Sequence, residues 1–295
     1  MKVLIIGGNR FVGLRLALML DRKSDIELHI LNRTGQVAHV RNAIIHKGDR
    51  NNFKPTHLDQ DFDLIFDFAT YTGEQARASL DYFKSVGRYI FVSTASVYNS
   101  GHLIQESAFD PSQWQIANAA PAANDPGSLY QFGKRHAESI FMQQAPFPTL
   151  LVRFPFILGP DDYTNRLSFH IQNVEQGLPI FFPNILMRTS FVSSDDAARF
   201  LFWSMDQNCT GPINVASPEP ISMQELMKNI EAITGKKAYY AKVANPENSS
   251  PYGDQDDWTL AVTRMEDQGF KASALASWLQ TTIQSLAGES KSVLH

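Results

Sequence analysis

Three side chains have the types and spacing that proton-coupled chemistry needs. Tyr130 and Lys134 stand four residues apart in the stretch YQFGK, and an apolar run leads into STASVY, which contains Thr94. Side chains four residues apart share one face of a helix. Thr94 stands where a buried strand would end, and ligands of open α/β sheets bind outside the carboxyl ends of strands. We therefore expect a hydroxyl, a phenol and an ammonium to meet at one site.

This combination suits hydride transfer at a carbon that bears oxygen, because a proton must move on that oxygen at the same time. A free tyrosine has a pKa of about 10, and lowering it by about three units corresponds to roughly 4 kcal/mol. A nearby ammonium and an oxidised nicotinamide ring would both favour the phenolate. We expect Tyr130 to act as the base, Thr94 to hold the substrate oxygen, and Lys134 to hold the nicotinamide ribose.

The opening stretch KVLIIGGNRFVG predicts a buried strand, a glycine turn and the start of a helix. Backbone N–H groups and the helix dipole make such a turn an anion site. Gly7 would allow the tight turn and Gly13 the close packing of helix on sheet. The residues expected to hold a dinucleotide here are Gly7, Gly8, Asn9, Arg10, Phe11, Val12 and Gly13.

Arg10 stands where such loops usually have their middle glycine. The second strand ends in Asn32 and Arg33, where an NAD site usually has Asp or Glu. Arg33 has the planar fork of donors that suits a phosphate, so we predict that Arg10 and Arg33 bracket a 2′-phosphate; the alternative is that both are solvated surface residues. NADP is thus favoured over NAD as the cofactor. Asp49, after the third strand, is a candidate acceptor for the adenine amino group, although a turn Asp is an equal alternative.

Short apolar runs alternate with amphipathic stretches through the first half of the chain. Strands are expected at 2–6, 26–32, 43–49, 62–69 and 88–98, with helices over 11–24 and 73–87, the latter ending at Gly87. This alternation predicts an α/β fold with a Rossmann-like, doubly wound parallel sheet. A long loop is expected over 99–127, then a helix over 128–144 and a strand over 149–157.

The second half indicates a smaller lobe. We expect a dinucleotide-binding domain of residues 1–158 with 190–215, and a discontinuous substrate-binding lobe of 159–189 with 216–295. Helices are expected over 166–177, 221–235 and 272–288, the stretch 190–205 is expected to be a short strand followed by a helix, and Ser222 with Glu225 has the spacing of a capping box. Arg166 and Arg188 are weak candidates to meet a substrate diphosphate. His136 and His170 lack a second ligand at metal spacing, so no metal site is predicted.

The composition is that of an ordinary globular protein. The chain has 295 residues, 43% of them hydrophobic, and a net charge of −4, which argues against broad attraction to nucleic acid. The single cysteine fits a reducing compartment. No run of about 18 apolar residues and no signal-peptide pattern is present, so we expect a cytoplasmic chain without a membrane segment.

Taken together, these motifs resemble those of the extended short-chain dehydrogenase/reductase family, the NAD(P)-dependent epimerase/dehydratase group. The resemblance rests, in chain order, on GGNRFVG, DFAT, STASVY, YQFGK, RFPFILGP and FVSSDDAARF. It implies that Phe68, Ala69, Thr70 and Phe154 also contact the cofactor. It further implies a nucleotide sugar as the substrate and a possible homodimer through the helix after the fourth strand and the YQFGK helix.

Within this group, epimerisation or simple reduction is favoured over dehydration. A dehydratase has an acidic residue beside the active hydroxyl, whereas Ala95 and Ser96 follow Thr94 here. An NADP-dependent reductase of a small carbonyl compound is an alternative. The arginine in the glycine motif and the NR dipeptide are similar to an atypical branch that includes chloroplast stem-loop-binding proteins. A non-catalytic, cofactor-sensing or RNA-associating regulator is therefore a second alternative, which an intact Thr94, Tyr130 and Lys134 disfavour.

Overall fold

A seven-stranded sheet forms the centre of the computed structural model, which describes residues 1–53, 58–59, 61–116 and 125–292. The strands lie in the order β12-β7-β5-β4-β1-β2-β3, and every neighbouring pair is parallel. The strand bounds are Lys2–Ile6 for β1, Glu27–Asn32 for β2, Ile44–Lys47 for β3, Asp61–Asp67 for β4, Ser85–Thr94 for β5, Thr149–Phe154 for β7 and Gly211–Asn214 for β12. The strand order reverses between β1 and β4, which is where open α/β sheets bind ligands.

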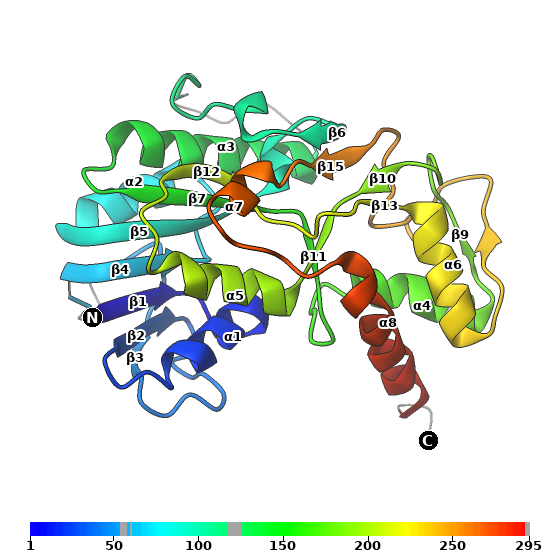
Figure 1. Cartoon of the computed structure of the whole chain (residues 1–295), viewed down its shortest axis with the longest axis horizontal. Coiled ribbons are helices and arrows are strands. Elements are labelled where there is room, and N and C mark those ends of the chain that lie inside the picture. Colours follow the sequence, from blue (N-terminus) through cyan, green and yellow to red (C-terminus); the bar gives the residue numbers. More distant parts are fainter. Residues whose placement is uncertain (54–57, 60, 117–124, 293–295) are drawn as a thin grey trace.

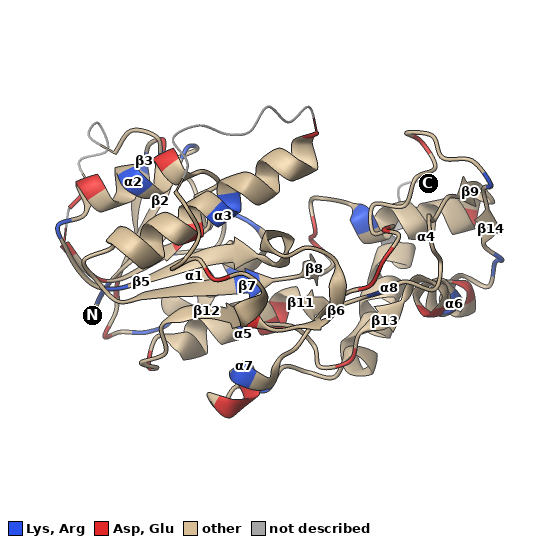
Figure 2. Cartoon of the chain, turned by 90° about the horizontal axis from the view of Figure 1, so that it is seen from above, with Lys and Arg blue, Asp and Glu red and all other residues tan. Residues whose placement is uncertain are grey.

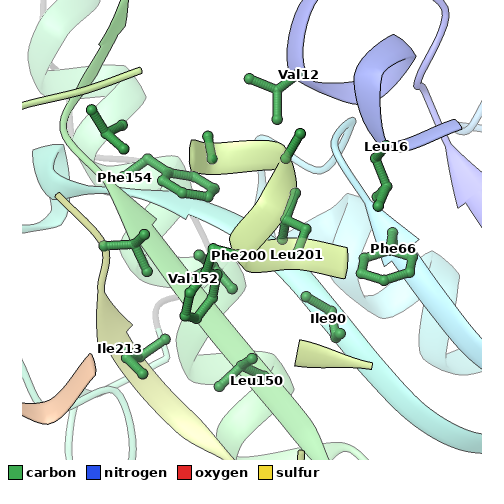
Figure 3. Close-up of a cluster of buried hydrophobic side chains, with 14 of the residues drawn as sticks. Val12, Leu16, Phe66, Ile90, Leu150, Val152, Phe154, Phe200, Leu201 and Ile213 are labelled. Carbon is green, nitrogen blue, oxygen red and sulfur yellow. The ribbon is translucent and has the colours of Figure 1, made fainter. Parts of the chain in front are cut away.

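Helices cover both faces of this sheet (Figure 1). On one face α1 (Phe11–Leu20) packs beside α5 (Ser194–Ser204), and on the other α2 (Gly73–Tyr82) packs beside α3 (Pro126–Gln144). Figure 3 shows the core under α1 and α5, where side chains from β4, β5, β7 and β12 meet both helices. Fully burying one such aliphatic or aromatic side chain contributes roughly 1.5–3 kcal/mol, so this layer holds both helices firmly on the sheet.

The remaining elements form a smaller unit at one end of the sheet (Figure 1). Three helices, α4 (Arg166–Gln176), α6 (Met223–Thr234) and α8 (Leu275–Ser292), pack together around their own apolar cluster. A four-stranded sheet joins β13 (Ile221–Ser222), β10 (Arg188–Thr189), β15 (Trp258–Leu260) and β6 (Gly101–Ile104). The short pairs are β8 (Phe156–Leu158) with β11 (Phe191–Ser193), and β9 (Pro179–Ile180) with β14 (Tyr239–Tyr240).

The expected fold class is confirmed, and most of the expected elements are present within a few residues. The capping box at the start of α6 is confirmed, since Ser222 Oγ accepts from Glu225 N at 3.1 Å and Glu225 Oε2 accepts from Ser222 N at 2.9 Å. The helix end at Gly87 is wrong. Helix α2 stops at Tyr82, and Gly87 lies inside β5, because pairing with β4 extends that strand back to Ser85.

Two further expectations change in detail. The stretch 99–127 is not all loop, because it contains β6 and a short 3-10 helix, Glu106–Ala108; residues 117–124 lie outside the described residues. The division into domains stays a prediction. Leu260, Val262 and Met265, expected in the lobe, pack in the core of the large sheet, with α7 (Thr263–Asp267) next to β12.

A fully buried ion pair locks α3 onto the sheet. Arg153 of β7 and Glu138 of α3 are both 0% exposed, and Arg153 Nη2 donates to Glu138 Oε2 at 2.5 Å. Ser93, at the end of β5, donates to Glu138 Oε1 at 2.6 Å, and Arg153 Nη1 donates to the Tyr98 hydroxyl at 2.7 Å. The pair therefore sets the register of the helix that carries Lys134 against the strand that carries Thr94.

Removing one partner of this pair should destabilise the protein strongly, because the other charge stays buried without compensation. We expect Glu138→Gln to lower the free energy of unfolding by about 3–5 kcal/mol, measured by chemical denaturation. The control is Lys237→Gln, whose pair with Glu231 at 3.6 Å is on the surface and should contribute less than about 1 kcal/mol. Equal, small losses for the two variants would contradict this role of the buried pair.

Candidate active site

A single cavity of about 870 Å³ runs along the carboxyl edge of the large sheet. Its lining includes residues that follow β1, β2, β3, β4, β5 and β7, together with residues of α3 and of the segment after β8. Parallel strands all present their carboxyl ends at this edge, so residues far apart in the sequence meet here. Of the predicted site residues, the cavity is lined by Gly7, Gly8, Asn9, Arg10, Phe11, Val12, Gly13, Asn32, Arg33, Asp49, Phe68, Ala69, Thr94, Tyr130, Lys134, Phe154 and Arg166.

The glycine turn has the form that a phosphate cradle needs. A Cβ atom on Gly13 would come within 2.4 Å of the Gly8 Cα, so α1 can approach the turn closely only with glycine there. Gly8 itself has φ of 78°, a left-handed conformation that favours glycine. The glycine turn and the start of α1 thus border the cavity together, which fits a bound pyrophosphate.

Arg10 lines the cavity, but the structure gives it a partner that the sequence did not predict. Its guanidinium lies 3.8 Å from the ring centroid of Tyr163, a residue of the segment after β8. Arg33 also lines the cavity, is exposed, and has no ion-pair partner among the described residues. Both arginines thus border the cavity, Arg10 with an aromatic partner, and their joint contact with a 2′-phosphate stays a prediction.

The polar residues that follow β2 and β3 have local structural contacts. Asn32 Oδ1 accepts from Gly35 N at 2.7 Å and from the Thr34 hydroxyl at 2.8 Å, so its side chain shapes the turn after β2. Asp49 is exposed at the cavity, and its Oδ1 accepts from Asn51 N at 2.9 Å. The second Asp49 carboxylate oxygen accepts no hydrogen bond from the described part of the chain, which leaves it available to a ligand.

The turn after β4 is held by a second buried ion pair. Asp67, fully buried, accepts from Arg50 Nη2 at 2.7 Å, from the Tyr89 hydroxyl at 2.6 Å and from the Thr70 hydroxyl at 2.5 Å. The Arg50 guanidinium beside Asp67 lowers the pKa of that carboxyl, against the effect of burial, which is the largest single influence on it. Thr70, predicted to touch the cofactor, is buried in this network and does not line the cavity; only its backbone faces Lys134.

The three predicted catalytic side chains meet at the cavity. Tyr130 and Lys134 lie on α3, and Thr94 ends β5, where its hydroxyl accepts from Ser96 N at 3.1 Å and lies near enough to Tyr130 to lower the pKa of the phenol. Lys134, 3% exposed, donates from Nζ to the carbonyls of Thr70 at 2.7 Å and Val92 at 3.0 Å. Gly133 permits this arrangement, because a Cβ there would lie 2.3 Å from the Tyr71 carbonyl oxygen.

The ionisation of these groups differs from the expectation. Although the Tyr130 side chain is 38% exposed, burial of its phenol by the cavity walls raises the pKa of Tyr130 to about 12, against the hydrogen bond from Thr94, which lowers it. Burial also lowers the pKa of Lys134 to about 8, against the nearby carboxylates of Asp67 and Glu138. The chain alone therefore favours the neutral phenol, and a further positive charge in the site is needed to form the phenolate.

The two arginines predicted to meet a substrate diphosphate differ in position. Arg166, at the start of α4, is exposed and lines the cavity. Arg188 is not among the lining residues, because its guanidinium donates to the Pro220 carbonyl at 2.6 Å and pairs with Glu225 at 3.2 Å. That prediction is therefore not supported. The sequence reasoning also missed several lining residues: Tyr71, Asp162, Tyr163, Thr164, Thr189 and Trp258.

Three of the lining residues that the sequence analysis did not name could have been found from their position in the sequence. Asp162, Tyr163 and Thr164 follow the Gly-Pro turn after β8, so the rule that sites lie beyond strand ends applies to them. Thr189 and Trp258 come from short strands of the smaller unit, for which no pattern was visible. Over the described ranges, no group of three or more His, Cys, Asp or Glu is placed to hold a metal ion. No helix in those ranges is long and apolar enough to cross a membrane.

The fold and the glycine turn define a dinucleotide-binding protein of the doubly wound α/β class. A sequence model of the NAD dependent epimerase/dehydratase family matches residues 3–216, and the chain belongs to this family. Two solved structures show the same fold over nearly the whole chain. UDP-glucuronic acid 4-epimerase from Bacillus cereus, in complex with NAD, is 17% identical, covers 99% of this chain and 98% of its own, and has a TM-score of 0.72.

The second structure is UDP-glucose 4-epimerase from Thermotoga maritima with UDP-glucose, 15% identical, covering 100% of both chains with a TM-score of 0.72. At such identities the likeness is one of fold. A curated relative from Arabidopsis thaliana, "Chloroplast stem-loop binding protein of 41 kDa b", is 27% identical over 199 residues. That match takes in 62% of this chain and about half, 49%, of the relative's length.

The buried ammonium should leave a signature in the pH dependence of stability. Because the pKa of Lys134 in the folded state is about 8, below its ordinary value of 10.5, the unfolded chain binds more protons between these values and stability rises with pH. We expect the free energy of unfolding to rise by about 2 kcal/mol from pH 7.5 to 9.5 relative to Lys134→Met. Lys242→Met, at an exposed position, is the control and should follow the wild type. Parallel curves for wild type and Lys134→Met would contradict the lowered pKa.

Proposed function

We propose that this chain is an enzyme that uses a nicotinamide dinucleotide to oxidise and reduce a sugar-like hydroxyl or carbonyl, and that it is a nucleotide-sugar epimerase. One observation carries the proposal: Thr94, Tyr130 and Lys134 line the same cavity as the glycine turn after β1. Family membership supports the class of reaction.

The residues present fit the cofactor. The turn from Gly7 to Gly13 would hold the pyrophosphate, Asp49 the adenine amino group, and Lys134 the nicotinamide ribose. When bound, the oxidised nicotinamide ring supplies a hydride acceptor and a positive charge. Thr94 then holds the substrate oxygen by a hydrogen bond, and Tyr130 takes the proton from that oxygen or returns it. The raised pKa of Tyr130 in the chain alone keeps the base neutral until the site is filled.

Two considerations support a nucleotide sugar and an epimerase. The similar structures named above are epimerases described with UDP-sugars or NAD, although at low identity. Arg166 lines the cavity and is exposed, so it can meet a diphosphate. Dehydration is disfavoured because the residues after Thr94 are Ala95 and Ser96, neither of which can act as the acid for loss of water.

NADP is proposed as the preferred cofactor. The end of β2 offers no carboxylate for ribose hydroxyls, and Asn32 is engaged in its own turn. Arg33 has no ion-pair partner among the described residues and lines the cavity beside that strand end. A planar guanidinium without a competing carboxylate suits a 2′-phosphate.

The main test is turnover of candidate nucleotide sugars by the wild type and by Tyr130→Phe, with product analysis and absorbance at the reduced-nicotinamide band. Loss of the acid–base hydroxyl should lower kcat by about 10²–10⁴-fold while cofactor affinity stays within about threefold. Tyr239→Phe, on an exposed tyrosine far along the chain, is the control and should keep wild-type turnover. If Tyr130→Phe turned over at the wild-type rate, the proposed role of the phenol would be wrong.

Cofactor choice is tested by comparing the Kd values of NADP and NAD for the wild type and Arg33→Ala. Loss of a charge-assisted contact should weaken NADP binding by about tenfold or more and leave NAD binding nearly unchanged. Arg22→Ala is a matched control, since it removes the same charge from an exposed position that does not line the cavity. An equal loss for both dinucleotides would refute contact with a 2′-phosphate.

A second candidate function is a regulator that associates with RNA, favoured by the similarity to the stem-loop binding protein of Arabidopsis thaliana. The net charge of −4 does not support it, and acidic and basic segments alternate along the chain in Figure 2. Cells that keep every phenotype of the wild type when carrying Tyr130→Phe would favour this second function over the enzyme.

A further inference from the structure

The segment from Gly159 to Asn165, after β8, lies against the first turn of α1. Two contacts tie it there. Arg10 of the glycine turn stacks on the ring of Tyr163, with the guanidinium carbon 3.8 Å from the ring centroid. Arg15 of α1 donates from Nη1 to Asp161 Oδ2 at 2.6 Å. The substrate-side segment is thus attached to the element that would hold the cofactor phosphates.

Phe11 strengthens the aromatic contact. Its ring meets Tyr163 edge-on, with the centroids 6.1 Å apart and the planes at 88°. Phe11 has φ of 52°, in the left-handed region that residues other than glycine rarely adopt. Tyr163 therefore has a cation on one side and an aromatic edge on another, although it is 51% exposed. Cation–π contacts of this kind are attractive even at the surface.

Arg15 forms ion pairs with two carboxylates. Arg15 Nε donates to Asp195 Oδ1 at 2.7 Å, at the start of α5, in addition to Asp161. One arginine thus connects α1, α5 and the segment after β8. Because Asp161 is two residues from Tyr163, this contact keeps the tyrosine near Arg10.

Both members of the aromatic contact border the cavity. Arg10 and Tyr163 line it together with Gly7, Gly8 and Gly13, the residues proposed to hold the pyrophosphate. A dinucleotide bound there would have the Arg10–Tyr163 contact beside its phosphates. Arg10, which replaces the usual middle glycine, is therefore placed to affect how the dinucleotide is held.

We propose that the contact between Arg10 and Tyr163 is a latch that slows release of the bound dinucleotide, with Tyr163 positioning Arg10. This inference rests on the proposed function, since it needs a dinucleotide in the cavity. The latch also separates two reaction classes. An epimerisation returns the cofactor to its starting oxidation state, so retention costs nothing, whereas a reductase consumes one reduced cofactor in each turnover and must exchange it. Slow release is thus compatible with the proposed epimerase.

The experiment measures the rate at which reduced dinucleotide leaves the protein. The full chain is loaded with NADPH, and separately with NADH, and mixed with a large excess of the oxidised form while nicotinamide fluorescence is followed. The variants are Tyr163→Ala, Arg10→Gly and the two combined. Tyr163→Phe keeps the ring, and Tyr239→Ala removes an equally exposed tyrosine outside the cavity.

We expect Tyr163→Ala and Arg10→Gly each to speed release by about threefold to tenfold. The double variant should speed release by less than the product of the two single factors, because both changes remove the same contact. Tyr163→Phe and Tyr239→Ala should stay within twofold of the wild type. The unfolding transition of Tyr163→Ala should stay as cooperative as that of the wild type, which separates a latch from loss of structure. Release from Tyr163→Ala at the wild-type rate would overturn the latch while leaving the proposed function intact. Failure of the wild type to bind either dinucleotide would overturn both.

Discussion

The charge pair between Arg153 and Glu138 is the contact on which the candidate site depends. It lies where β5, β7 and α3 meet, with no exposure to solvent. Two charges in such a place tolerate little displacement, because their attraction and hydrogen bonds must offset a large loss of hydration. Glu138 is one turn beyond Lys134 on α3, and its partner Ser93 immediately precedes Thr94. Any shift of the helix along the sheet would break the pair and separate the hydroxyl from the phenol.

A second buried pair has the same effect on the neighbouring turn. Arg50 and Asp67 fix the backbone from β4 to Thr70, whose carbonyl accepts from Lys134. Lys134 is consequently held between two carbonyls contributed by different strand ends. The ammonium is placed by main-chain groups whose positions are set by buried charges, which makes the geometry of the site insensitive to motion at the surface.

In the protein without a ligand, the pKa of Tyr130 is too high for its phenol to act as a base near neutral pH. Burial acts against charge on both Tyr130 and Lys134, raising the pKa of the phenol and lowering that of the ammonium. Both directions follow from one cause, the low polarity of the cavity wall. A bound cationic ring would favour the phenolate in the same surroundings, since charge interactions are stronger where water is excluded. The proposed chemistry thus couples the activity of Tyr130 to occupation of the site.

The sequence by itself determined the doubly wound sheet, the position of the glycine turn and the meeting of Thr94 with Tyr130 and Lys134. These depend on local patterns: apolar runs, a four-residue spacing, and the rule that sites lie at strand ends. It also predicted the capping box of α6, a contact between residues three apart. Only the tertiary structure decided that Arg10 stacks on Tyr163, that Arg188 pairs with Glu225 and that Thr70 is buried. The partner of a long side chain is set by whatever the fold brings within reach, and those neighbours lie tens of residues away in the sequence. The raised pKa of Tyr130 is likewise decided only by the tertiary structure, because burial is a property of the packed chain and not of the spacing between a phenol and a lysine.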